Sequence, residues 1–207
     1  MVGLDDWLPI AYHEAGHAVA VVAHKGFLEK ILIRKDHSQP YIDRRGRQID
    51  CMGIMEGGNF YSPLYFTRKA DLVFEGPDPA LQVITLARMM KKEISVCLAG
   101  GWAEADLCLP KRISMENRRW TLRTFHGAKD DYQRVFLVLK EMQILTRRGA
   151  LKVFEDEAWD LVRTYRDAIT EIATLLLERE VLKYDSIAEI CSKHGVIYPP
   201  VAEAAKH

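Results

Sequence analysis

One segment near the start of the chain, residues 8–25, places a strong condition on the fold. It consists mostly of small and apolar residues, follows Asp6 as an N-cap and is ended by Gly26, so we expect a helix. Within it the sequence reads H-E-A-G-H, with His13 and His17 four residues apart. Residues at this spacing share one face of a helix, so both imidazoles can reach one metal ion. The fold therefore has to accommodate a helix with two metal ligands on one face.

The residue after the first histidine, Glu14, gives this motif its chemistry. In an H-E-x-x-H site the glutamate stands beside the metal and accepts a proton from the metal-bound water. Zinc lowers the pKa of that water toward about 7, which makes a hydroxide available to attack a carbonyl. A catalytic zinc usually has three protein ligands and one open position. The chemistry of the side chains leaves five candidates open for the third ligand: Glu104, Asp106, His126, Asp130 and Asp131.

The remaining pattern predicts a mainly α-helical domain with a small β-sheet near its N-terminus, an α+β fold. Residues 27–34 and 51–56 predict two strands, and the polar stretch 35–50 between them is a loop or an irregular hairpin. Apolar residues recur at helical spacing in several later segments. These predict helices over 81–107, 128–146 and 151–180, and a short one after Asp185, its N-cap, to about 194.

Two stretches allow more than one interpretation. Gly100-Gly101, inside the predicted helix 81–107, is either a helix break or a point of close backbone packing. The predicted connection 108–127 carries five basic side chains and is either a solvated loop or a local site for an anion or partner. We find no repeat and no clear linker, so residues 1–207 are expected to form a single domain.

Composition excludes several classes of protein. The sequence is 48% hydrophobic and 28% charged, which is ordinary for a globular domain and argues against disorder. Basic and acidic residues number 29 each, so no charge excess predicts binding to nucleic acid or to an anionic membrane. No apolar run approaches the roughly 20 residues of a membrane span. The N-terminus lacks a secretory pattern and the four cysteines lack C-x-x-C spacing, so we expect a cytoplasmic protein with reduced thiols.

Four stretches, in order, resemble the peptidase domain of FtsH-type ATP-dependent zinc metalloproteases. Residues 13–18 read H-E-A-G-H-A, and residues 97–107 resemble that family's L-L-G-G-R-A-A-E-E-L helix. G-A-K-D-D at 127–131 resembles its G-A-x-N-D segment, whose aspartate is the third zinc ligand. L-L-E-R-E-V-L at 176–182 resembles a late helix that ends L-L-E-x-E-x-L. The resemblance extends from about residue 10 to 193.

This resemblance implies a role for each matching residue. His13, His17 and Asp131 become the zinc ligands, and Glu14 becomes the general base. The family also holds an extended peptide on a short strand beside the cleft, where backbone pairing tolerates many sequences. Here that strand corresponds to Met52, Gly53, Ile54, Met55 and Glu56. The alternative for these five residues is an ordinary sheet strand.

The sequence also departs from the family. It has no G-x-x-x-x-G-K-[ST] phosphate loop, so no ATPase activity is expected from this chain. Trp102 replaces the arginine of the G-G-R motif, and Ala105 replaces the first glutamate of the pair that follows. A homo-oligomer and an ATPase partner acting in trans both remain open.

We therefore predict a zinc metallopeptidase with a zincin-like fold, acting on flexible or unfolded protein segments. The alternative is a non-proteolytic binding or regulatory module on a retained metallopeptidase scaffold. A metal-dependent hydrolase of non-peptide amides is a third hypothesis, but it leaves the peptide-binding strand without a purpose.

Overall fold

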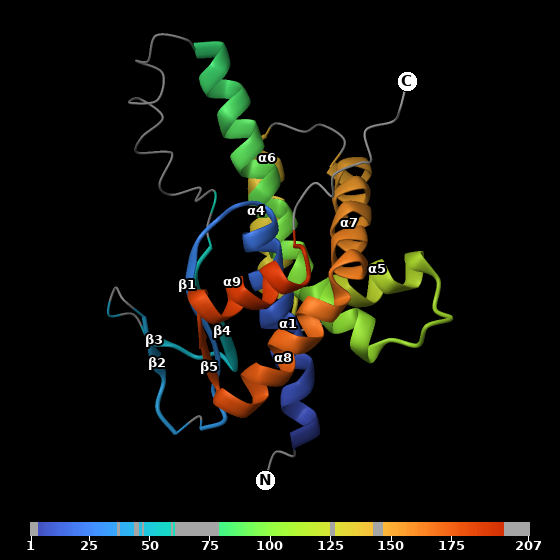
Figure 1. Ribbon diagram of the computed structural model, residues 1–207. Coiled ribbons are helices and arrows are strands. Elements are labelled where there is room, and N and C mark those ends of the chain that lie inside the picture. Colours follow the sequence, from blue (N-terminus) through green and yellow to red (C-terminus); the bar gives the residue numbers. More distant parts are fainter. Residues whose placement is uncertain are drawn as a thin grey trace.

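Two long helices, α1 (Leu4–Ala23) and α4 (Pro79–Cys108), pack against each other at the centre of the molecule (Figure 1). The structure is a computed structural model that describes residues 4–36, 38–43, 46, 48–58, 60, 79–124, 127–142 and 147–196. Further helices surround this pair: α5 (Met115–Thr124), α6 (Lys129–Glu141), α7 (Arg147–Thr164), α8 (Arg166–Arg179) and α9 (Tyr184–Lys193). Together with a small antiparallel sheet they confirm the predicted α+β class.

Small residues allow α1 and α4 to approach closely. A Cβ atom at Gly16 would lie 2.6 Å from the carbonyl oxygen of Ala99 and 2.7 Å from the Cβ of Ala103. Helix α4 runs without interruption through Gly100-Gly101, so the prediction of a helix break was wrong and that of close packing is confirmed. Because α1 and α4 approach each other this closely, His13 and His17 lie against α4.

The sheet has the strand order β4-β1-β5, and both pairings are antiparallel. Strands β1 (Leu28–Ile33) and β4 (Gly53–Gly57) confirm the two predicted strands. Strand β5 (Val181–Lys183) was not predicted, because the apolar pattern around it was assigned to the end of a helix. Within the part of the chain that the structure describes, β4 pairs with β1 alone and is an edge strand. The stretch between β1 and β4 contains a hairpin of β2 (Tyr41–Ile42) and β3 (Gln48–Ile49), as one interpretation predicted.

The single helix predicted over 151–180 was wrong. The chain leaves helical geometry at Tyr165, with φ −109° and ψ 27°, and forms α7 and α8 instead. Helix α7 packs on α4, whereas α8 packs on α1. A straight helix could not pack on α4 and α1 at once. The break at Tyr165 lets the apolar face of α7 pack on α4 and that of α8 pack on α1.

Three smaller corrections concern element ends. Helix α1 begins at Leu4, so Asp6 lies in its first turn and is not the N-cap; burial of Trp7 holds this turn against the core. Helix α9 begins at Tyr184 after Lys183, which places Asp185 inside the helix, where an acid favours the dipole without capping. Helix α6 ends at Glu141, and residues 143–146 of the predicted helix lie outside the described part.

The predicted connection 108–127 contains helix α5, so the interpretation as a solvated loop was wrong. Three of its arginines make internal contacts. Arg118 is buried and donates to the carbonyl oxygens of Ala105 and Pro110. Arg119 and Arg123 both pair with Glu155, which is fully buried on α7. These charges dock α5 onto the helices around it.

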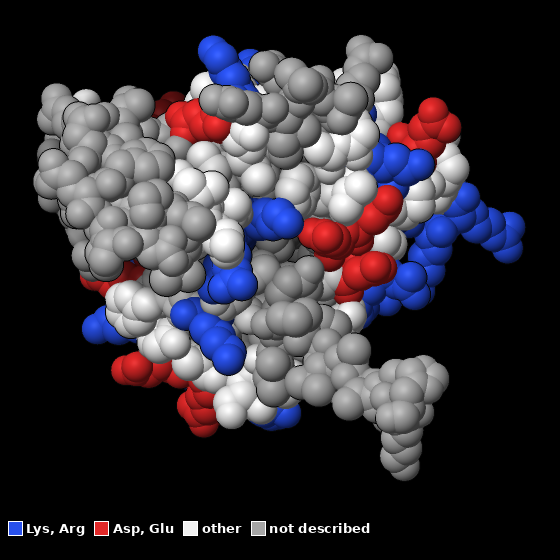
Figure 2. Space-filling view, turned by 90° about the horizontal axis from the view of Figure 1, so that it is seen from above, with Lys and Arg blue, Asp and Glu red and all other residues white. Residues whose placement is uncertain are grey.

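Acidic and basic side chains are interspersed over the face shown in Figure 2, in keeping with the equal numbers of the two kinds of residue. Among the described residues, no helix combines the length and apolarity needed to cross a membrane.

Candidate metal centre

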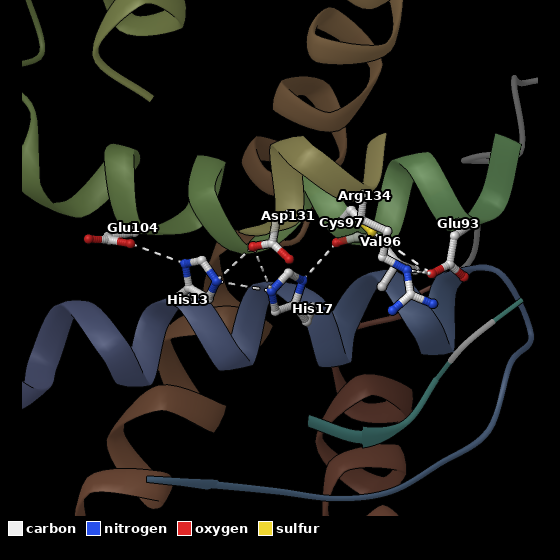
Figure 3. Close-up of polar contacts among 8 residues, drawn as sticks. All are labelled: His13, His17, Glu93, Val96, Cys97, Glu104, Asp131 and Arg134. Carbon is white, nitrogen blue, oxygen red and sulfur yellow. Dashed lines mark hydrogen bonds and ion pairs between the residues drawn. The ribbon is translucent and has the colours of Figure 1, made fainter. Parts of the chain in front are cut away.

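Three side chains from two helices, His13 and His17 of α1 and Asp131 of α6, point toward one another (Figure 3). The Nε2 atoms of His13 and His17, both on α1, are 3.0 Å apart. Oδ2 of Asp131, in the first turn of α6, lies 3.0 Å from Nε2 of His13 and 3.3 Å from Nε2 of His17. The structure thus brings together the three residues that the resemblance implied as ligands.

The Nδ1 atom of each ring has its own hydrogen-bond partner, and this partner determines whether Nε2 carries a proton or a free lone pair. Nδ1 of His17 lies 2.7 Å from the carbonyl oxygen of Val96, which can only accept, so Nδ1 carries the proton. Nδ1 of His13 lies 3.1 Å from Oε2 of Glu104, which likewise accepts as a carboxylate. In the neutral rings both Nε2 atoms are therefore unprotonated, as in a metal-ligating histidine with an outer partner.

The donor set fits a metal ion. When both rings are neutral, two imidazole lone pairs and a carboxylate oxygen face one another, and a metal ion between them would satisfy all three acceptors. Ligand atoms about 2.1 Å from a tetrahedral zinc would be roughly 3.4 Å apart, close to the separations seen here. Two histidines and one carboxylate, with a fourth position left for water, are a common ligand set of catalytic zinc.

Electrostatics in this cluster favour positive charge on the two histidines and negative charge on Asp131. Burial alone lowers the pKa of His13, but hydrogen bonds to Asp131 and Glu104 outweigh it and raise that pKa well above its usual value. Burial likewise lowers the pKa of His17, and Asp131 more than compensates. Burial raises the pKa of Asp131, but the two histidines dominate and hold it below its ordinary value. A cation at this point would be stabilised by the same carboxylates.

Glu14 lies beside the cluster, between α1 and strand β4. The side chain is buried, with 6% of its surface exposed, and has no hydrogen-bond or ion-pair partner among the described residues. Its carboxylate rests on the backbone of Gly53, where a Cβ atom would come within 2.5 Å of Oε1. Burial raises the pKa of Glu14, and the nearby His13 and His17 partly offset this. A buried carboxylate with a raised pKa is suited to accept a proton.

The other third-ligand candidates are elsewhere. Glu104 contacts the outer nitrogen of His13 and so positions the ring. Asp106 pairs with Arg166 at 2.8 Å. Asp130 lines the cleft but does not belong to the cluster that could hold a metal ion, and His126 lies outside the described residues.

Sequence reasoning missed the part that α4 plays in this site. Val96, Gly100 and Glu104 follow one another at four-residue intervals, so they lie on one face of α4. Val96 and Glu104 bond the two histidines, and Gly100 leaves room for the ring of His17. The four-residue spacing of Val96, Gly100 and Glu104 equals that of His13 and His17 on α1. This equal spacing was the sequence signal from which the contact between the two helix faces could have been predicted.

A cleft of about 540 Å³ opens onto the cluster. Helices α1, α4 and α6 line it together with strand β4 and the residues before that strand. Of the five predicted substrate-binding residues, Met52, Gly53, Ile54 and Met55 line the cleft. Glu56 is not among the lining residues and instead pairs with Lys30 at 3.3 Å and accepts a hydrogen bond from Tyr41. One edge of a small sheet thus borders the metal cluster.

Comparison with known proteins gives no family assignment, because the sequence matches no protein-family model and no curated protein. The similarity to the FtsH-type peptidase domain therefore depends on the four motifs and on the residues that carry them.

Proposed function

We propose that this protein is a zinc metallopeptidase with a zincin-like, FtsH-type peptidase architecture. The observation that carries the proposal is the convergence of His13, His17 and Asp131 beside the buried Glu14, which has no partner among the residues that the structure describes. A purely structural cluster would have no need of a partnerless carboxylate at this point, because burying one is costly. The same observation favours an enzyme over a non-proteolytic binding module.

In this proposal His13, His17 and Asp131 would hold zinc, with Glu104 and Val96 orienting the rings. When bound, zinc supplies Lewis acidity that polarises a peptide carbonyl and activates water. Glu14 accepts the proton of that water and later donates it to the leaving amine. Burial raises the pKa of Glu14, which favours its role as a group that takes up and then releases a proton.

The position of β4 supports a peptide as the substrate. Within the described part of the chain one edge of β4 has no partner strand, so it can bond the backbone of an extended segment, and Ile54 and Met55 are among the residues that line the cleft. Pairing of this kind requires a strand-like conformation, so flexible or unfolded protein segments fit best. A small non-peptide amide would make no use of this edge.

Two measurements test the proposal. Elemental analysis should find about one zinc per chain in the wild type and a clear loss in His17→Ala and Asp131→Ala. His194→Ala and Asp106→Ala are matched controls, because neither residue belongs to the group His13, His17 and Asp131, and both variants should keep zinc.

Hydrolysis of an unfolded protein such as reduced, alkylated albumin should occur with the wild type. It should fall by at least about a hundredfold in Glu14→Gln, which keeps zinc but loses the base. A zinc-loaded wild type without hydrolysis would favour the binding module, and a wild type unable to bind zinc would reject both the site and the enzyme.

A further inference from the structure

The walls of the cleft are strongly acidic. Among the described residues that line it, six are carboxylates and one is a guanidinium. The carboxylates are Glu14, Asp50, Glu93, Glu104, Asp130 and Asp131, and the guanidinium is Arg134. Even a bound divalent cation would leave this lining net negative. A cleft with one sign of charge concentrates ligands of the opposite sign.

Most of these charges already have a function within the protein. Glu93 pairs with Arg134 at 2.6 Å, so the guanidinium is neutralised inside the cleft (Figure 3). Glu104 and Asp131 contact the histidines. Glu14 has no hydrogen-bond or ion-pair partner in the described part of the chain, and it is buried against β4. A buried carboxylate without a partner in the described part of the chain points to a polar ligand in the cleft.

Asp50 and Asp130 differ from the rest. Both are exposed, and neither has an ion-pair partner among the described residues. They come from different elements: Asp50 lies between β3 and β4, and Asp130 lies in the first turn of α6, next to Asp131. Their carboxylates are therefore available to a ligand that enters the cleft from solvent along either element.

We infer that the cleft selects cationic peptide segments, whose lysine or arginine side chains pair with Asp50 and Asp130. This inference rests on the proposed function, since it names the substrate class of the same site. A peptide extended along β4 alternates its side chains, and long basic side chains can reach carboxylates at the border of the cleft. Arginine can bind such a carboxylate through two hydrogen bonds. Acidic segments would meet the exposed carboxylates of Asp50 and Asp130 and be repelled.

Binding of labelled peptides, measured by fluorescence anisotropy, tests this inference apart from catalysis. The protein is the full chain with Glu14→Gln, loaded with zinc, so that no peptide is cleaved. Two peptides share the same apolar residues and differ only in carrying two arginines or two glutamates. We expect the arginine peptide to bind at least about tenfold tighter at low salt, with the difference shrinking as salt is added.

Variants assign the effect to the two aspartates. Asp50→Asn and Asp130→Asn, added singly, should each reduce the preference about threefold, and together they should bring it close to one. Glu157→Gln, an exposed acid on α7 outside the cleft, is the matched control and should change nothing. Equal binding of the two peptides, or a preference that survives the double variant, would overturn the inference. Charge-selective binding with no hydrolysis by the wild type would support it and contradict the proposed function.

Discussion

Gly100 lies directly against the imidazole of His17: a Cβ atom at position 100 would come within 2.4 Å of the ring nitrogen Nε2. This is the nitrogen that faces Asp131. The absence of a side chain on α4 therefore determines where one of the proposed metal ligands can stand.

Substituting Gly100 should damage the metal centre more than the fold. In Gly100→Ala the methyl group displaces the ring of His17, and we expect a loss of about 1–3 kcal/mol in the free energy of unfolding. Zinc affinity, measured by competition with a chromophoric chelator, should fall at least about tenfold. Gly149→Ala is the matched control, because position 149 lies in helix α7 with open space around it. That change should leave zinc binding intact and stabilise the helix by about 0.5–1 kcal/mol.

Removing the carboxylate behind His13 should weaken metal binding without removing a ligand. Glu104→Ala leaves the ring of His13 free to turn, and we expect zinc affinity to fall by about 10–100-fold. Asp106→Ala, two residues away on the same helix and paired with Arg166, should leave the affinity unchanged. An unchanged affinity in Glu104→Ala would mean that helix packing alone orients the histidine.

The buried Glu155 should matter for stability. Arg119, Arg123 and Tyr132 all direct donors at this carboxylate, and Tyr132 bonds it at 3.0 Å. Glu155→Ala would leave two guanidiniums without their buried partner, so urea unfolding should show a loss of about 3–5 kcal/mol. Tyr132→Phe removes one hydrogen bond and should cost about 1 kcal/mol.

Tyr132 directly follows the proposed ligand Asp131, so its hydrogen bond to Glu155 connects α7 to the residue beside the candidate site. The exposed acid on the same helix, changed in Glu157→Gln, should be close to neutral in urea. A neutral Glu155→Ala would show that the arginines find other partners.

Stability should fall in mild acid because of His24. Burial, with a smaller effect of the charge on Lys92, lowers the pKa of His24 from 6.5 to about 4. Between these two values the unfolded chain binds a proton that the folded chain does not, so this contribution is fully present above about pH 6.5 and is lost as the pH falls toward 4. It amounts to about 3 kcal/mol in the free energy of unfolding.

The measurement is urea unfolding of chelator-treated protein across this pH range, comparing the wild type with His24→Gln. The variant should lose the additional pH dependence, while His194→Gln should retain it. Parallel curves for the wild type and His24→Gln would show that His24 does not cause the loss.

Local spacing was sufficient for several parts of the structure. The helix around His13 and His17 and the strands β1 and β4 follow from patterns a few residues long. Such patterns report how neighbouring side chains are arranged on one element, and this geometry does not depend on the rest of the fold. For the same reason the sequence alone predicted that His13 and His17 share one face of a helix and that Glu14 lies beside them.

Other features depended on tertiary packing. Chemistry alone left five candidates for the third ligand, and the family motif favoured Asp131; the packing of α6 on α4 brought that residue to both histidines. The roles of Glu104 and Gly100, and the break at Tyr165, arise where α4 and α1 meet other helices. Contacts between residues about 100 positions apart are set by how whole surfaces fit together, which residue spacing along the chain does not encode. The sequence by itself therefore determined the helix that carries His13, Glu14 and His17, and only the tertiary structure decided which distant side chains complete the candidate site.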